Sequence, residues 1–377
     1  MAYSETRAIA GSGLLKKLNT QMVQLDMELT ERCNHNCVHC YINLPENDAV
    51  ARQRELSLEK IEDILRQAAD LGCLIVRFTG GEPLLRKDFP DIYLYARQLG
   101  LKVILFTNAT LIDDGLIDLF SRIPPLKKVE VSVYGMTQIS YESVTRTPGS
   151  FDRAFTGINR LLDAHILFVV KGVFPSGNEA DIGAFERFAH GIPYMKEKPD
   201  LVMHYDLRAR REPDKNQRIR MHRIPPESWM DHLKQVGGQS PKKNSGRFMV
   251  SSENRHKLFT CEVGKTPCVD AYGHVQACLL LRHRETVYDL NIGSLKDALG
   301  CFFPALLEKK AGNKDFLARC GRCILRGLCD QCPAKSWMEH GTLDTPVDYY
   351  CRLAHVEAEY AGLIPKGVKG WELNGKK

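Results

Sequence analysis

The amino-acid sequence predicts an α/β fold, namely an open, partial (β/α)6 barrel followed by a smaller cysteine-rich domain. Two observations lead to this prediction. Short apolar segments alternate with amphipathic ones from about residue 22 to residue 207, which is typical of a parallel sheet with right-handed helical crossovers. Nine of the 13 cysteines lie further along the chain, between residues 261 and 351. Six strand–helix units are too few for a closed eightfold barrel, so we expect the barrel to be open.

The expected strands are short and rich in valine, leucine and isoleucine, which favour strands. They cover residues 23–29, 74–78, 102–106, 129–133, 167–173 and 201–207. Amphipathic helices are expected between them, over residues 58–71, 89–100, from about 113, 150–164 and 181–191. Ser57 has a side chain suited to capping the first of these helices, and Gly72 is placed to end it.

The chain divides accordingly into five parts. They are an N-terminal extension (1–21), a barrel domain (22–235), a linker (236–260), a cysteine-rich domain (261–360) and a C-terminal tail (361–377). No apolar run approaches the ~20 residues of a membrane span, and the N-terminus has no signal-peptide core. We therefore expect a cytoplasmic protein with no membrane partner, whose reduced thiols bind metal rather than form disulfides.

The net charge is +6, and much of the excess lies in residues 204–223. The basic residues there are Arg208, Arg210, Arg211, Lys215, Arg218, Arg220 and Arg223. The segment is either a solvated surface or a patch for an acidic peptide or another anionic substrate. Nucleic acid is not expected as a partner, because few aromatic residues stand among these charges to stack on bases.

Three cysteines follow the first expected strand, with the spacing Cys33-x3-Cys37-x2-Cys40. Three thiolates can hold a four-iron cluster and leave one iron open to a substrate or cofactor, as on a catalytic zinc. A structural zinc site, with His35 or His39 as the fourth ligand, is the alternative. Loops after parallel barrel strands share one rim, where barrel enzymes keep their chemistry.

The cysteine motif, followed by Tyr41, resembles the signature of radical S-adenosylmethionine (AdoMet) enzymes. In that family the open iron binds the amino and carboxylate groups of AdoMet. An electron from the cluster then cleaves AdoMet to methionine and a 5′-deoxyadenosyl radical, which abstracts a hydrogen from the substrate. The resemblance implies an oxidoreductase that receives electrons from a flavodoxin or ferredoxin, with Tyr41 close to the adenine.

Further residues of the expected rim match the same family. Gly80, Gly81 and Glu82 match its GGE motif, whose backbone and carboxylate contact the methionine ammonium. Paired glycines allow close backbone approach, and a carboxylate pairs with a cation. Asn108 and Ser132 stand where the family contacts the ribose and the carboxylate of AdoMet.

The later cysteines resemble the SPASM extension, a domain with two auxiliary 4Fe–4S clusters, although the pair Cys329 and Cys332 is spaced x2 where the family usually has x3. The resemblance implies that one cluster is held by Cys261, Cys268, Cys278 and Cys332. It implies that the other is held by Cys320, Cys323, Cys329 and Cys351. Together with the AdoMet cluster, these two make three clusters. Cys73 and Cys301 are left without a ligand role, and we expect them to be buried thiols. A zinc ribbon is the alternative for the central run.

The resemblance leaves the substrate open. Most SPASM proteins modify ribosomally made peptides or proteins by crosslinking or oxidation, which makes a peptide the first expectation, with a separate peptide-recognition protein as a further partner. A haem or tetrapyrrole side-chain modifier is the alternative, and a non-catalytic iron–sulfur electron carrier is the second. Lys171, His204 and Tyr205 point toward the rim by register, but the sequence identifies no catalytic acid or base.

Overall fold

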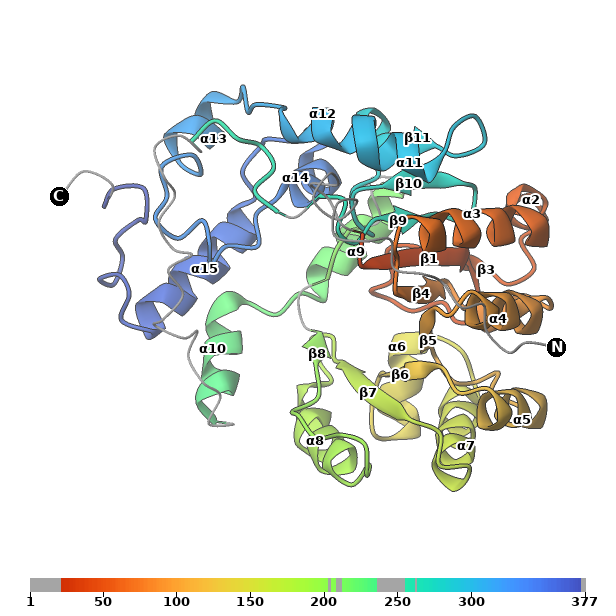
Figure 1. Ribbon diagram of the computed structural model, residues 1–377. Helices are drawn as coiled ribbons and strands as arrows, with labels where there is room; N and C mark the ends of the chain where they lie inside the picture. Colours follow the sequence, from red (N-terminus) through yellow and green to blue (C-terminus); the bar gives the residue numbers. More distant parts are fainter. Residues whose placement is uncertain (1–21, 203–204, 208–211, 236–254, 262, 374–377) are drawn as a thin grey trace.

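The computed structural model describes residues 22–202, 205–207, 212–235, 255–261 and 263–373. A nine-stranded sheet with the order β11-β10-β9-β1-β4-β5-β6-β7-β8 forms its centre (Figure 1). Six consecutive strands of this sheet are parallel. They are β1 (Gln24–Thr30), β4 (Ile75–Gly80), β5 (Lys102–Thr107), β6 (Leu126–Val133), β7 (Phe168–Val173) and β8 (Leu201–Val202). The predicted open barrel of six parallel strands is therefore confirmed.

Helices connect these strands, as the alternating pattern predicts. The barrel domain has α2 (Ala49–Arg54), α3 (Leu58–Asp70), α4 (Phe89–Gln98), α5 (Asp114–Arg122), α6 (Gln138–Thr145), α7 (Ser150–Asp163), α8 (Ile182–His190), α9 (Pro213–Met221) and α10 (Pro226–Gln235). It also has the short pair β2 (Arg32–Cys33) and β3 (Leu44–Pro45) and the turns η1 (Pro83–Leu85) and η2 (Glu179–Asp181). In Figure 1 helices α3, α4, α5 and α7 lie along one side of the curved sheet.

The C-terminal part is built from short elements. Its strands are β9 (Cys268–Val269), β10 (His274–Gln276) and β11 (Val287–Asp289). Its helices are η4 (Arg284–Thr286), α11 (Leu295–Asp297), η5 (Ala298–Phe302), α12 (Phe303–Leu307), α13 (Lys314–Ala318), α14 (Pro333–His340) and α15 (Asp348–Tyr360). No described helix is both long enough and apolar enough to cross a membrane.

Local details agree with the predicted boundaries in most places. The Ser57 side chain accepts a hydrogen bond from the Lys60 amide at the start of α3. Gly72 follows the end of α3 with φ +89°, a conformation that favours glycine. The sixth strand is shorter than predicted, since among its described residues Leu201 and Val202 pair with β7 and residues 205–207 do not.

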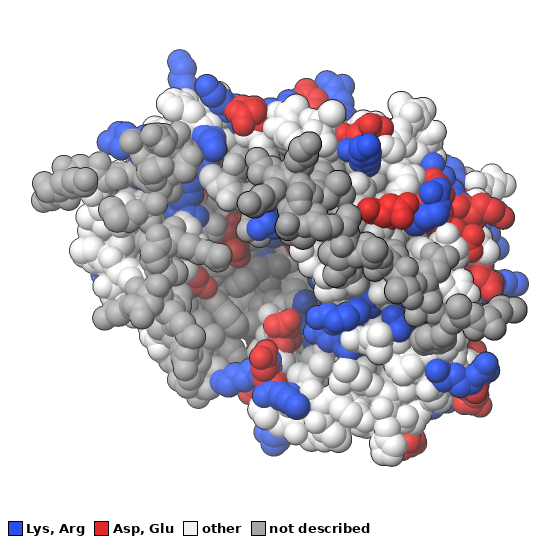
Figure 2. Space-filling model, in the orientation of Figure 1, with Lys and Arg blue, Asp and Glu red and all other residues white. Residues whose placement is uncertain are grey.

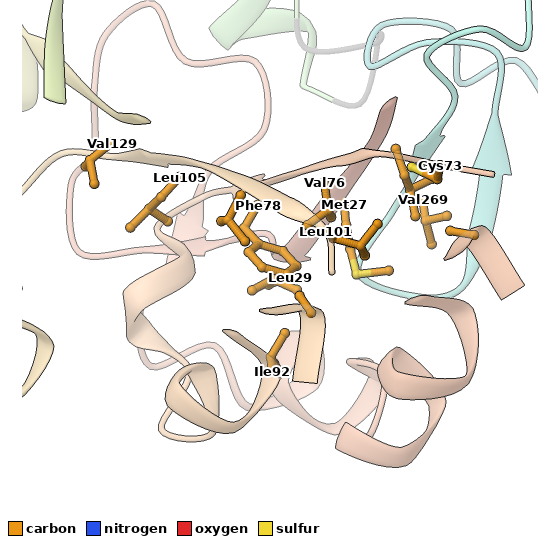
Figure 3. Packing of buried hydrophobic residues seen from close by; sticks show 14 of the residues in the cluster. Met27, Leu29, Cys73, Val76, Phe78, Ile92, Leu101, Leu105, Val129 and Val269 are labelled. Carbon is orange, nitrogen blue, oxygen red and sulfur yellow. The ribbon is translucent and has the colours of Figure 1, made fainter. Parts of the chain in front are cut away.

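The strands have two different faces because successive side chains point to opposite sides of a sheet. Leu25, Met27 and Leu29 of β1 are buried in the main hydrophobic core, under the helices. Asp26 and Glu28, at the alternate positions, belong to the concave face inside the barrel. Figure 3 shows the apolar layer, in which side chains of β1, β4 and β5 meet Ile92 of α4.

The C-terminal part continues the barrel sheet. Strand β9 pairs in parallel with β1, so that Asp26 stands beside Cys268 and Met27 beside Val269. Val269 is fully buried in the same core as Met27 (Figure 3). The predicted parts 22–235 and 261–360 therefore share one sheet. The domain boundaries between these parts remain a prediction.

The two cysteines without a predicted ligand role differ in exposure. Cys73 is buried at the end of α3, as expected. Cys301 is exposed, so the prediction that it is a buried thiol was wrong. Cys301 lies in η5. Leu299 before it and Phe303 after it, at the start of α12, are buried, so that Cys301 faces the opposite side of the helix, toward solvent.

Candidate functional site

The cysteine loop is fixed to the barrel by the GGE turn. The Gly81 amide donates to the Thr30 carbonyl (2.7 Å), and the Glu82 amide donates to the Arg32 carbonyl (2.9 Å). A Cβ on Gly80 would lie 2.2 Å from the Thr30 oxygen, and one on Gly81 would lie 2.1 Å from the Arg32 oxygen. Both glycines are therefore needed for the end of β4 to lie against the backbone that leads into Cys33.

The Glu82 carboxylate is fully buried at the same rim. It accepts hydrogen bonds from the Thr107 hydroxyl (2.9 Å), the Asn108 amide (2.8 Å) and the Leu84 amide (3.1 Å). Burial raises the pKa of Glu82 to about 7, although these three donors oppose the rise. The side chain therefore connects the ends of β4 and β5, and it is poised between its charged and neutral forms near neutral pH.

This carboxyl group gives a testable pH dependence. Its pKa rises from 4.5 in the unfolded chain to about 7 in the folded one. The stabilisation by the bound proton is therefore complete below about pH 4.5 and is lost as the pH rises through about 7. We expect the melting temperature of the iron-free protein to fall over this interval, and Glu82→Gln to flatten the fall. The same change at exposed Glu59, whose pKa is lowered by a hydrogen bond from Ser57, should leave the fall between pH 4.5 and 7 unchanged.

Asn108, which directly follows β5, connects the end of that strand to the cysteine loop. Its Nδ2 donates to Oδ1 of Asn34 (2.9 Å), the residue after Cys33, and lies 4.0 Å from the Cys33 sulfur. Its Oδ1 accepts from the amide and the hydroxyl of Thr110, and Asn34 in turn donates to that hydroxyl (2.8 Å). The structure thus brings the predicted residues Cys33, Glu82 and Asn108 together.

The three thiols form one electrostatic group. Burial, the Glu82 carboxylate and Cys40 raise the pKa of Cys33, and burial together with Cys33 and Cys40 raises that of Cys37. The His35 amide lies 3.4 Å from the Cys33 sulfur and the Asn43 amide lies 3.4 Å from the Cys40 sulfur, as donors to thiolates would. Thiols with raised pKa ionise when a metal centre binds them, so the loop fits an iron–sulfur cluster.

The structural zinc alternative would place His35 or His39 beside the three thiols as the fourth ligand. Burial lowers the pKa of His35 to about 4 and that of His39 to about 3, which favours the neutral ring, the form in which imidazole binds a metal. Within the described residues no group of three or more His, Cys, Asp or Glu side chains is arranged to hold a single metal ion. His39 packs instead against the ring of Tyr205, with centroids 5.0 Å apart.

Ser132 and Tyr41 are the two other predicted AdoMet contacts. Ser132 lies on β6 and is paired in register with Lys171 on β7. Tyr41 lies where the barrel meets the C-terminal part. Burial and the Glu28 carboxylate raise the pKa of Tyr41, and Arg282 and Cys268 are also close enough to affect it. The structure joins neither residue to the cysteine loop by a side-chain hydrogen bond among the described contacts.

Six of the predicted auxiliary-cluster cysteines line one cavity in the C-terminal part. They are Cys261, Cys320, Cys323, Cys329, Cys332 and Cys351. Cys278 adjoins this group, since it affects the pKa of Cys332. Cys268 faces the barrel instead, where burial and Glu28 raise its pKa. The structure therefore gathers seven of the eight thiols and leaves the partition between two clusters a prediction.

The chain after α15 covers this cavity. The Gly370 amide donates to Nε2 of His355 (3.0 Å), and the Gly370 carbonyl accepts from the Ile324 amide (3.2 Å). A Cβ on Gly370 would lie 2.6 Å from the Cys323 sulfur. Trp371 lines the cavity, with its ring centroid 5.3 Å from that of His355 and 5.1 Å from the Arg319 guanidinium.

Removing the Trp371 ring should therefore open the cavity to solvent. In Trp371→Ala we expect the cysteines of the iron-free protein to react several-fold faster with iodoacetamide, because the covering segment loses its main apolar contact. Peptide mass spectrometry would locate the modified thiols. Tyr360→Ala, which removes a 40% exposed ring from α15, serves as the control, and equal rates in both variants would contradict the prediction.

Part of the basic segment 204–223 makes structural contacts. Arg223 pairs with Glu339 of α14 (2.6 Å) and donates to the Tyr205 carbonyl, and Arg220 pairs with the same Glu339. Lys215 is buried and donates to Asn43 beside the cysteine loop. His204, Arg208, Arg210 and Arg211 lie outside the described residues. Figure 2 shows Lys and Arg interspersed with Asp and Glu on the face seen there.

The sequence reasoning missed a group of charges on the concave face. Glu28 pairs with Arg282, which also approaches Glu31 (3.5 Å). Tyr272 donates to Glu31 from the C-terminal part (2.8 Å). The available signal was the alternation in the first strand, where acidic residues at 26 and 28 stand between leucine and methionine.

Known proteins share both the sequence and the fold of the barrel. Residues 27–189 match the family model of the radical SAM superfamily. The chain is 30% identical over 177 residues to an Fe-coproporphyrin III synthase of Methanosarcina barkeri, covering 45% of this chain and 43% of that one. It is 45% identical over 82 residues to a PqqA peptide cyclase of Streptomyces rochei, covering 22% of each. The chain thus spans less than half the length of these curated relatives.

A solved structure resembles the described chain over most of its length. SuiB of Streptococcus suis with bound S-adenosylmethionine superposes with a TM-score of 0.61 and covers 89% of this chain and 77% of its own. At 17% sequence identity this likeness concerns the fold. The family match rests on the segment that carries the cysteine loop, the GGE turn and Asn108. The chain therefore contains a radical SAM domain over residues 27–189.

Proposed function

We propose that this protein cleaves AdoMet reductively and uses the resulting 5′-deoxyadenosyl radical to abstract a hydrogen from a substrate. A radical SAM domain implies AdoMet and a 4Fe–4S cluster. Cys33, Cys37 and Cys40 would hold that cluster, which supplies the electron when it is bound. The observation that carries the proposal is the joining of the cysteine loop to Glu82 and Asn108 by backbone and side-chain hydrogen bonds.

The remaining predicted residues would hold AdoMet itself. Gly80, Gly81 and Glu82 would meet its ammonium group, because the buried carboxylate offers a charge that a cation favours. Asn108 and Ser132 would contact the ribose and carboxylate, and Tyr41 the adenine. The closely packed rim would keep water away from the reacting atoms.

We propose further that the C-terminal part is a SPASM domain with two auxiliary clusters. Seven neighbouring thiols, six of them around one cavity, support this assignment. Each thiol would keep the role expected from the sequence, with Cys268 directed toward the barrel and Cys320, Cys323, Cys329 and Cys351 forming the outer set. Iron and sulfide analysis of the Cys320→Ala variant tests the outer set, which should lose one cluster and retain the AdoMet cluster.

A peptide or protein is the proposed substrate. SuiB, whose fold this chain shares, has been solved with its precursor peptide SuiA, and the PqqA peptide cyclase matches in sequence. A separate recognition protein and a flavodoxin or ferredoxin would be the partners. These assignments concern the whole protein and follow from the relatives rather than from a described contact.

The deciding experiment is anaerobic reconstitution with iron and sulfide. Adding AdoMet should change the EPR signal of the reduced N-terminal cluster, and dithionite with AdoMet should release 5′-deoxyadenosine even without substrate. A reconstituted protein that binds three clusters but forms no 5′-deoxyadenosine would favour an electron carrier and contradict the proposal.

A tetrapyrrole substrate is the second candidate. The relative that synthesises Fe-coproporphyrin III favours it. Titration of the reconstituted protein with a porphyrin and with an acidic peptide distinguishes the two candidates. Binding of the porphyrin alone would replace the peptide as the proposed substrate.

A further inference from the structure

Cations, an aromatic ring and carboxylates form a continuous band across the concave face of the barrel. Arg77 of β4 pairs with Asp26 of β1 (2.9 Å), and its guanidinium lies 4.8 Å from the ring centroid of Phe106 on β5. The Lys171 ammonium of β7 lies 5.9 Å from the same centroid and 3.8 Å from a carboxylate oxygen of Glu130 on β6. All five strands contribute from the face opposite to the helices.

The cationic side chains of this band are more exposed to solvent than its carboxylates. The side chains of Arg77 and Lys171 are 23% and 29% exposed, whereas those of Asp26 and Glu130 are 3% and 9% exposed. The Arg77 Nε is buried and has no hydrogen-bond partner. Lys171 makes its ion contacts at 3.8 and 4.0 Å, the second with exposed Asp200. The two cations therefore lie 4.8 and 5.9 Å from the centre of the Phe106 ring and are more exposed than Asp26 and Glu130.

The band lies next to the proposed AdoMet site. Lys171 is in register with Ser132, and Phe106 directly precedes Thr107 and Asn108 at the end of β5. Lys171 and Glu130 also line a cavity that is closed on one side by residues 194–200. A group bound on this band would thus lie on the concave face of the barrel, beside the strand positions of Ser132 and Asn108.

We propose that Arg77 and Lys171 bind a carboxylate of the substrate, while Phe106 stacks on the apolar part that carries it. Guanidinium and ammonium groups favour carboxylates, and the half-buried Phe106 ring beside them offers an apolar contact. The site rests on the proposed function and narrows its substrate class to carboxylic acids. The carboxylate comes either from an acidic residue of a peptide or from a propionate of a tetrapyrrole.

Two matched pairs of probes test the site on the reconstituted holoprotein. One pair is a synthetic peptide with central glutamates and its glutamine twin, and the other is coproporphyrin III and its tetramethyl ester. Binding is measured anaerobically by fluorescence quenching, without AdoMet or reductant. We expect the wild type to bind at least one acid about tenfold more tightly than its neutral twin, and the pair that shows the preference identifies the source of the carboxylate.

Lys171→Gln should remove most of this preference without weakening the binding of the neutral twin. Unchanged binding of the neutral twin also shows that the variant is folded. Phe106→Leu should weaken acid and neutral twin alike. Lys127→Gln makes the same charge change at an exposed position of β6 and should leave the preference intact. Equal binding of both acids and their twins, or a preference that survives in Lys171→Gln, would overturn the site. The release of 5′-deoxyadenosine by the wild type is a separate measurement, so the proposed function can fail while this site stands.

Discussion

Replacing Cys37 by alanine is expected to abolish the proposed cleavage of AdoMet. Cys37 is the central and most buried thiol of the cysteine loop, with 5% of its surface exposed. Its loss would leave two thiolates for a cluster that needs three, so a second iron would lose its protein ligand. We expect 5′-deoxyadenosine formation to fall by more than about 100-fold, because even outer-shell changes at metal sites cost up to that factor. Iron content and the EPR signal of the N-terminal cluster should fall with it.

The control for this prediction is Cys301→Ala. Cys301 is exposed and belongs to none of the predicted ligand sets, so the variant should keep its iron and its activity. Full cluster content in Cys37→Ala, together with unchanged 5′-deoxyadenosine formation, would remove the loop from the proposed site.

Replacing Gly81 by alanine will destabilise the rim more than most single substitutions. The new Cβ would lie 2.1 Å from the Arg32 carbonyl oxygen, 2.6 Å from its carbon and 2.7 Å from the Glu31 oxygen. All three are backbone atoms, so no side chain can rotate away and the end of β4 must move. We expect about 2–3 kcal/mol of lost stability, as for other overpacked sites, and a lower iron content because the cysteine loop begins at Arg32 and Cys33.

Gly312→Ala is the matched control, since a Cβ there meets no atom within 4 Å. Chemical denaturation of both variants, with iron analysis after reconstitution, measures the two effects. If Gly81→Ala unfolded at the wild-type denaturant concentration, the close approach described for the GGE turn would be wrong.

The barrel could be predicted from the sequence because its elements carry strong local signals. Five of the six strands are long enough for an apolar pattern to show, and Ser57 and Gly72 mark both ends of α3. The sixth strand was predicted too long, because Tyr205 and Leu207 are buried without pairing with β7. The pairing of β9 with β1 could not be predicted, since two residues show no period and their partner is distant in sequence.

The candidate site was predictable only where residues are close in sequence. The spacing of Cys33, Cys37 and Cys40 and the GGE turn were visible as motifs. The structure adds that Gly81 packs against the backbone of the cysteine loop. The band of Arg77, Phe106 and Lys171 was not visible. Its members lie on three strands, and only the curvature of the sheet brings them to one surface.

The pairing of β1 with β9 affects the order in which the protein can be made. A ribosome releases the first strand early, whereas the strand that covers its outer edge comes from the last third of the chain. Native contacts between such distant segments form slowly. The first strand of the nascent barrel therefore keeps an uncovered edge until residues 268–269 have been synthesised.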